Sequence, residues 1–179
     1  MSEAIRYGTG VPGDYPQILA LNESAIPAVN RIEEKDLRQL HRQSEILLVA
    51  RAGEALAGFL LALNEHAEYE SINYQYFRRR YARFAYVDRI VVSESFRRMG
   101  IGAGLYEALF EATGHLPRIA CEVNVKPANP ASMHFHGQLG FSVVGEQDTE
   151  GGSKRVALMV RERQAQEQTA GKHAFRQRS

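Results

Sequence analysis

Two glycines that follow an apolar run are the residues of this chain best suited to binding a charged ligand. The run from Tyr86 to Val92 has the β-branched content of a strand, and Gly100 and Gly102 open a segment with helical spacing of apolar residues. The first amides of a helix lack intrahelical partners, and the helix dipole favours negative charge there. Because glycine has no Cβ, a phosphate can approach these amides closely. The pattern therefore predicts a phosphate-binding loop between a strand and a helix.

This loop resembles the pyrophosphate loop of the GNAT superfamily of acyl-CoA N-acyltransferases. The signature of that loop is Gln/Arg-x-x-Gly-x-Gly/Ala, and here it reads Arg97-x-x-Gly100-x-Gly102. The segment is not a Walker loop, because no Gly-Lys-Ser/Thr follows, and its last glycine is misplaced for a dinucleotide fingerprint. The resemblance implies acetyl-CoA as the acyl donor, with its pyrophosphate bound by Arg97, Arg98, Met99, Gly100, Ile101, Gly102 and Ala103.

A second segment, residues 129–141 (NPASMHFHGQLGF), is similar to the family pattern Asn-x-x-Ala/Ser-x-x-Phe/Leu-Tyr-x-x-x-Gly-Phe. By this resemblance Asn129 and Ser132 contact the pantetheine arm of the cofactor, whereas simple helix capping explains Asn129 equally well. The resemblance also implies that a backbone N–H on the preceding central strand polarises the thioester carbonyl. The candidates for this donor are Ile90, Val91 and Val92.

Two carboxylates are candidates for the base that deprotonates the amine. Glu122 lies in CEVN, which resembles the LEVR strand of the ribosomal-protein N-terminal acetyltransferases, where that Glu is the proposed base. Asp88 lies in VDRIVV, at the place where many GNAT enzymes have a Glu with the same task. Both residues alternate with apolar neighbours, so each also fits an exposed strand position or a paired carboxylate.

His136 is the clearest departure from the family pattern, which has a Tyr as general acid at this position. A phenol with a pKa of about 10 stays protonated at neutral pH, whereas an imidazole with a pKa of about 6.5 does not. If His136 is the acid, activity should fall as the pH rises through its pKa. Three other roles are open for His136. It could act as a base that relays a proton through water, it could only hydrogen-bond the sulfur, or it could be a half-buried histidine with no role in the chemistry.

The elements that position these residues follow from periodicity and turn signals. Strands are expected near residues 4–7, 46–51, 56–63, 86–92, 118–125, 141–145 and 154–160, and helices near 15–22, 32–42, 101–112 and 129–140. This is the GNAT order, and it predicts an α/β single-domain fold with a mixed central sheet of six to seven strands flanked by about four helices. We expect the domain to span residues 1–161, with residues 162–179 as a flexible tail that lacks an apolar period.

Residues 64–85 are rich in tyrosine and glutamate and end in a cluster of arginines, Arg78, Arg79, Arg80 and Arg83. Two interpretations are open. The segment is either a substrate lid whose acidic and tyrosine side chains meet a cationic amine, or a solvated helix and loop with aromatic packing. The arginines also suit a nucleic-acid or protein interaction module, but balanced surroundings favour ordinary surface charge.

Composition narrows the class of protein. The chain of 179 residues is long enough for one domain, and its formal net charge is +1. Its one cysteine, Cys121, cannot form an internal disulfide and should pack in the core. No Cys/His cluster has metal-site spacing, and no apolar run suits a signal peptide or membrane span. We therefore expect a cytoplasmic protein that binds neither nucleic acid nor membranes.

The resulting hypothesis is an N-acetyltransferase that moves an acetyl group from acetyl-CoA to a primary amine, either a small molecule or an α-amino group. The alternative is a catalytically silent acyl-CoA-binding regulatory domain, which the missing tyrosine at position 136 suggests. Many proteins of this fold dimerise, so the resemblance also leaves a homodimer open.

Overall fold

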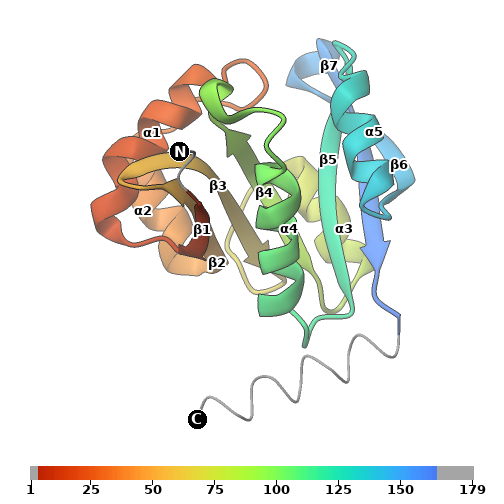
Figure 1. The fold of residues 1–179 in the computed structure, drawn as a ribbon. Coiled ribbons are helices and arrows are strands. Elements are labelled where there is room, and N and C mark those ends of the chain that lie inside the picture. The colour runs from red at the N-terminus through yellow and green to blue at the C-terminus, as the bar shows by residue number, and fades with distance from the viewer. Residues whose placement is uncertain (1–3, 165–179) are drawn as a thin grey trace. The chain divides into compact units, whose positions relative to one another are not determined.

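Residues 4–164, the part of the chain that the computed structural model describes, form seven strands and five α-helices (Figure 1). The strands are β1 (Ile5–Thr9), β2 (Ser44–Ala52), β3 (Ala55–Asn64), β4 (Ala85–Val92), β5 (Arg118–Lys126), β6 (Ser142–Thr149) and β7 (Lys154–Glu162). The helices are α1 (Tyr15–Ser24), α2 (Glu34–Gln43), α3 (Ile72–Arg80), α4 (Ile101–Ala112) and α5 (Pro130–Gln138). The predicted α/β class with a mixed sheet is confirmed.

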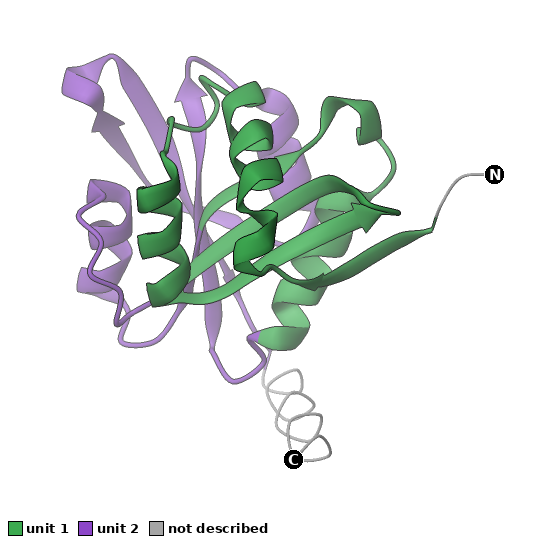
Figure 2. Ribbon diagram, turned by 90° about the vertical axis from the view of Figure 1, so that its left-hand side faces the viewer, with its two compact units in different colours: residues 1–63, 88–112 green, residues 64–87, 113–179 purple. Residues whose placement is uncertain are grey.

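The chain divides into two compact units (Figure 2). Unit 1 comprises Met1–Leu63 and Asp88–Ala112, and unit 2 comprises Asn64–Val87 and Thr113–Ser179. The hydrogen-bonded strand order is β1-β2-β3-β4-β5-β7-β6. Strand β4 is shared, because its first three residues belong to unit 2 and the rest to unit 1.

In unit 1, the antiparallel strands β1, β2 and β3 and the helices α1 and α2 form the core. Strand β1 pairs with β2, and β2 pairs with β3 through a hairpin that turns at Gly53, whose φ is 57°. Almost every residue of β3 is buried, as expected of a strand covered on both faces. Ile18 of α1 and Leu37 of α2 are fully buried. The predicted hairpin is confirmed, and both helices are present within two residues of their expected starts.

In unit 2, β5 is the strand that joins parallel and antiparallel pairing. It pairs in parallel with the start of β4, at Ala85↔Ile119 and Tyr86↔Ala120, and antiparallel with β7. Cys121 is buried in this strand, as expected. Strand β6 begins within the predicted strand start at residues 141–145 and runs to Thr149, just into the predicted turn at 148–153. Gly145 does not break the strand: a Cβ there would lie 2.5 Å from Tyr76 Oη, so its absence makes room for α3.

Helix α3 is absent from the predicted order of elements, but one of the two interpretations of residues 64–85 includes a helix. Ser71 begins the helix by accepting a hydrogen bond from the Tyr74 N–H. Tyr74 and Phe77 are fully buried, and their rings lie 5.5 and 5.8 Å from the ring of Tyr86. Residues 64–85 therefore match the second interpretation, a helix and loop with aromatic packing.

The last strand extends past the expected end of the domain. Beyond β7, the Arg163 N–H donates to the Pro117 carbonyl and its guanidinium to Thr113 Oγ1, both at 2.9 Å. The rest of the expected tail, residues 165–179, lies outside the described residues. Between residues 4 and 164, no helix is long and apolar enough to cross a membrane, and no three His, Cys, Asp or Glu side chains are grouped to hold a metal ion.

Candidate active site

The glycine-bearing loop lies between β4 and α4 in unit 1, where the sequence predicts it. The Ser93 N–H donates to the Ala57 carbonyl at 2.8 Å and ties the end of β4 to β3. The 3-10 turn Glu94–Phe96 follows, and residues 97–100 are exposed. The loop is therefore anchored in the sheet at its start and open to solvent at its centre.

Two residues of this loop adopt the left-handed backbone conformation. The φ angles are 62° at Arg98 and 75° at Gly100. A Cβ at Gly100 would meet no atom within 4 Å, so there is room for a side chain. Glycine is favoured here because the backbone has a positive φ. Arg98 holds a conformation that non-glycine residues rarely adopt, and such strain clusters at functional sites.

The N-terminus of α4 presents its first amides beside this turn. The Gly104 N–H donates to the Gly100 carbonyl at 3.0 Å and is the start of the intrahelical ladder. The N–H groups of residues 101–103 precede that bond, so helix geometry leaves them for a ligand. Left-handed residues followed by successive N–H groups form a concavity that binds anions.

Gly104, the glycine that is misplaced for a dinucleotide fingerprint, has a packing role. A Cβ there would lie 2.2 Å from Tyr7 Oη, so glycine lets the β1 tyrosine lie against the first turn of α4. Burial and the nearby Glu107 raise the pKa of Tyr7. This glycine is therefore explained by the contact between two elements of unit 1.

Asp88, one of the two candidate bases, lies in a buried ion pair. Its Oδ2 accepts a hydrogen bond from Arg89 Nε at 2.7 Å, and the two side chains are 4% and 2% exposed. The same guanidinium donates to Asn22 Oδ1 at 2.8 Å and to Asn30 Oδ1 at 3.0 Å. Arg89 thus joins β4 to the end of α1 and the loop after it. This geometry favours a structural role for Asp88.

Glu122, the other candidate base, is held by neutral donors from two other elements of unit 2. Tyr86 Oη on β4 donates to Glu122 Oε1 at 2.9 Å, and Asn73 Nδ2 on α3 donates to the same oxygen at 3.2 Å. Gln147 Nε2 on β6 donates to Asn73 Oδ1 at 2.8 Å. These donors orient the half-buried carboxylate without cancelling its charge. The arrangement favours Glu122 over Asp88 as a proton acceptor.

His136 is buried on α5, with 4% of its surface exposed, and the contacts of Nδ1 assign the proton to that nitrogen. This nitrogen lies 2.8 Å from the Ser132 carbonyl, which can only accept, and 3.3 Å from Ser132 Oγ. Burial lowers the pKa of His136, and the hydrogen bond to Ser132 opposes that shift. At neutral pH the ring is therefore neutral with Nε2 as its acceptor, which is the wrong state for donating a proton.

Asn129 and Ser132 form the N-terminus of α5. Asn129 Oδ1 accepts a hydrogen bond from the Ser132 N–H at 3.1 Å, and Pro130 occupies the first helical position. The capping role of Asn129 is confirmed. The contact of both residues with the pantetheine arm stays a prediction.

The predicted site residues fall into sets within each unit. Unit 1 contains Asp88, the backbone at 90–92 and the loop 97–103, and unit 2 contains Glu122, Asn129, Ser132 and His136. Sequence reasoning missed Tyr86, Asn73 and Gln147, the residues that surround Glu122. For Tyr86 there was a signal, a hydroxyl within an otherwise apolar strand start. For the other two the sequence has none.

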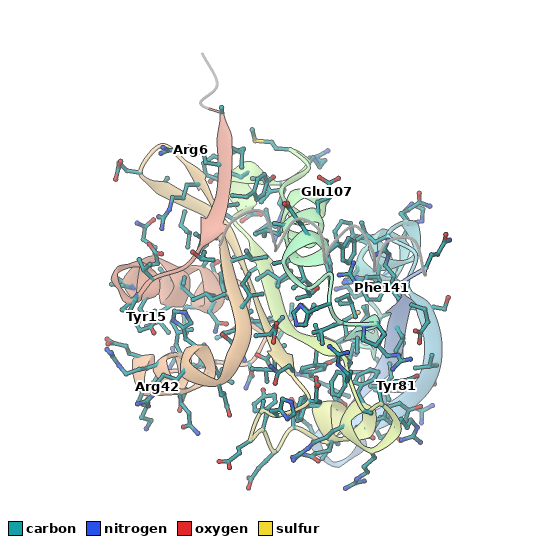
Figure 3. The ribbon with its side chains drawn as sticks, turned by 90° about the horizontal axis from the view of Figure 1, so that it is seen from below. Arg6, Tyr15, Arg42, Tyr81, Glu107 and Phe141 are labelled. Carbon is teal, nitrogen blue, oxygen red and sulfur yellow. The ribbon has the colours of Figure 1, made fainter. Side chains whose placement is uncertain are left out.

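A hollow of about 300 Å³ lies elsewhere in unit 1, lined by Pro12, Tyr15, Arg38, His41 and Arg42. Figure 3 labels two of these residues, Tyr15 and Arg42. Tyr15 Oη lies 2.9 Å from His41 Nδ1 and fixes the ring of that histidine. Burial lowers the pKa of His41, and the charge of Asp14 opposes the shift. None of the predicted site residues lines this hollow, so it is separate from the site proposed from the sequence.

Comparison with protein families gives one match that covers most of the chain. The model of the acetyltransferase (GNAT) family matches residues 16–141. A comparison with curated protein sequences finds no match.

Solved structures share the fold at low sequence identity. The ribosomal-protein-S18-alanine N-acetyltransferase from Escherichia coli is 16% identical, with a TM-score of 0.68 over 89% of this chain and 94% of the other. NAA60 from Arabidopsis thaliana in complex with acetyl-CoA is 16% identical, with a TM-score of 0.71 over 89% and 100%. The putative acetyltransferase yncA from Salmonella typhimurium with acetyl-CoA is 13% identical, with a TM-score of 0.69 over 91% and 96%.

Proposed function

The chain belongs to the acetyltransferase (GNAT) family, and on this premise we propose that it moves an acetyl group from acetyl-CoA to a primary amine by direct transfer. The observation that carries the proposal is the loop before α4. There, two left-handed residues precede the amides of residues 101–103, in the segment that matches the family signature. The enzyme therefore binds the pyrophosphate of the donor at this loop.

Donor binding uses backbone amides from Arg98 to Ala103, and the exposed guanidinium groups of Arg97 and Arg98 add positive charge. Two proteins of the same fold, NAA60 and yncA, were solved with acetyl-CoA, which supports this choice of donor. Asn129 and Ser132 contact the pantetheine arm. A backbone N–H among Ile90, Val91 and Val92 polarises the thioester carbonyl, a contribution of about 2.7–4 kcal/mol to lowering the barrier.

Glu122 is the base. Its carboxylate takes a proton from the ammonium group of the acceptor, and the neutral amine then attacks the thioester carbon. A C–N bond forms as the C–S bond breaks, CoA leaves as the thiolate, and the proton still carried by the attacking nitrogen passes to that thiolate. The products are the neutral amide and the CoA thiol. Orientation of the carboxylate by Tyr86 supports this role, because a base must be held within hydrogen-bond reach of the proton that it removes.

The departing thiolate needs less help than an alkoxide or amide leaving group. A thiol has an ordinary pKa of about 8.5, close to neutral pH, so its anion leaves without a strong acid. The neutral state of His136 fits a mechanism with no acid at this position. His136 instead holds the first turn of α5 through Nδ1, where Asn129 and Ser132 lie.

The acceptor is a primary amine, either a small molecule or an α-amino group. An α-amino group has support from the fold shared with a ribosomal-protein-S18-alanine N-acetyltransferase. The test begins with calorimetric titration of the purified protein with acetyl-CoA, with NAD and ATP as controls. Selective binding of acetyl-CoA is expected, and binding of all three or of none would refute the assignment of the loop.

A further inference from the structure

We propose that Asn73 is a positioning residue that fixes the carboxylate of Glu122 for proton transfer, and that Gln147 fixes Asn73 in turn. The inference rests on the proposed function, because it takes Glu122 as the base. Its basis is a chain of hydrogen bonds across three elements of unit 2, from β6 through α3 to β5.

The direction of this chain follows from its last member. An ionised carboxylate only accepts hydrogen bonds, so Asn73 must turn its NH₂ group toward Glu122 Oε1, 3.2 Å away. The amide oxygen of Asn73 then faces Gln147, whose Nε2 donates to it at 2.8 Å. Each amide thereby fixes the orientation of the next one, and the chain delivers an N–H to the base.

The element that carries Asn73 is held firmly in place. Asn73 is 9% exposed and lies next to Tyr74, whose Oη donates to the Asn64 carbonyl at 2.7 Å. Further along α3, Tyr76 Oη donates to the Val144 carbonyl of β6 at 3.1 Å. A second contact thus joins α3 to the strand that carries Gln147. The donor to Glu122 therefore stands on a rigid support, which is what precise placement of a catalytic group requires.

Asn73→Asp is the variant that separates positioning from a general structural role. It keeps the acceptor toward Gln147, removes the N–H, and places a second carboxylate beside Glu122 Oε1. Like charge and loss of a donor both disfavour ionised Glu122, so its titration midpoint should rise by about one pH unit. The matched control is Gln75→Glu, the same amide-to-carboxylate change on α3, at a residue that donates to the Tyr69 carbonyl instead.

The experiment titrates the Glu122 carboxyl by NMR in full-length protein with ¹³C-labelled glutamate, assigned with Glu122→Gln. The acidic limb of kcat/KM against pH is measured in the same variants. We expect both midpoints to rise together in Asn73→Asp and neither to move in Gln75→Glu. Thermal unfolding of each variant shows that the fold is retained.

Each outcome bears on a different claim. An unmoved Glu122 midpoint in folded Asn73→Asp, or an equal loss of kcat/KM at every pH, would overturn the positioning role. A raised NMR midpoint with an unmoved acidic limb supports the contact but counts against Glu122 as the base. A wild-type protein that binds acetyl-CoA and acetylates no amine refutes the proposed function, and the NMR titration still decides the role of Asn73.

Discussion

Tyr86 donates its phenolic proton to Glu122 Oε1 over 2.9 Å, from a ring that is fully buried. That ring lies 5.5 Å from the ring of Tyr74 and 5.8 Å from that of Phe77, so the aromatic packing of unit 2 fixes where the hydroxyl points. The core thus determines the place of the candidate base. Variants can separate the packing of these rings from the reactivity of Glu122.

Tyr86→Phe keeps the ring and removes only the hydroxyl. We expect a loss of about 0.5–1.5 kcal/mol in the free energy of unfolding and a shift of the acidic limb of kcat/KM to higher pH. Tyr74→Phe is the control, because it removes a buried hydroxyl that donates to the Asn64 carbonyl rather than to Glu122. A pH profile that moves equally in both variants would argue against the link between Tyr86 and the base.

Glu122→Gln and Asp88→Asn distinguish the two candidate bases. Loss of a general base lowers the rate by about 10²- to 10⁴-fold, so we expect this effect on kcat in Glu122→Gln with the fold intact. Asp88→Asn leaves the buried Arg89 charge without its carboxylate and should cost about 3–5 kcal/mol of unfolding free energy. Urea unfolding and kcat per folded enzyme measure the two effects. A large loss of kcat in Asp88→Asn, together with a near-normal kcat in Glu122→Gln, would make Asp88 the base.

Gly100→Val tests the donor-binding loop. A β-branched residue at a φ of 75° strains the backbone by about 1–2 kcal/mol, and the turn should open and lose its affinity for acetyl-CoA. Gly151→Val is the control, because that glycine has a φ of 66° and open space around it, in a turn of unit 2. Calorimetry should show lost binding only in the first variant. Undiminished binding in Gly100→Val would remove the loop from the donor site.

The loop was predictable because its signal is local. A strand, a polar link, two glycines and a helix start lie within about seventeen residues, and turn chemistry depends on neighbours in sequence. The N-cap at Asn129 was predictable for the same reason. The hairpin at Gly53 was also predictable from residues that are neighbours in sequence.

The surroundings of Glu122 were not predictable, because their residues are far apart in sequence. Asn73 is 49 positions from Glu122, and Gln147 is 74 positions from Asn73. Helix α3 was missing from the predicted order because its buried residues, Asn73, Tyr74 and Phe77, do not form an apolar stripe, in a segment that ends in arginines. The packing of Tyr74 and Phe77 against Tyr86 determines which face of this helix is buried.

The burial of His136 predicts how stability depends on pH. Its pKa in the folded state lies below the unfolded value of about 6.5, so the unfolded state binds protons first as the pH falls. The free energy of unfolding should therefore decrease below about pH 6.5, until the folded pKa is passed. His136→Phe should reduce this dependence, and urea unfolding between pH 5 and pH 8 measures it. A steeper dependence in the variant would contradict this reading of the ring.

Acetylation of an amine is the most direct test of the central claim. The protein is incubated with acetyl-CoA and a panel of small primary amines and peptides with free α-amino groups, and free CoA thiol and acetylated product are quantified together by mass spectrometry. The account expects equal amounts of both for at least one acceptor class, with turnover lost in Glu122→Gln while acetyl-CoA still binds. Binding without acetylated product from any amine, or full turnover in Glu122→Gln, would contradict it.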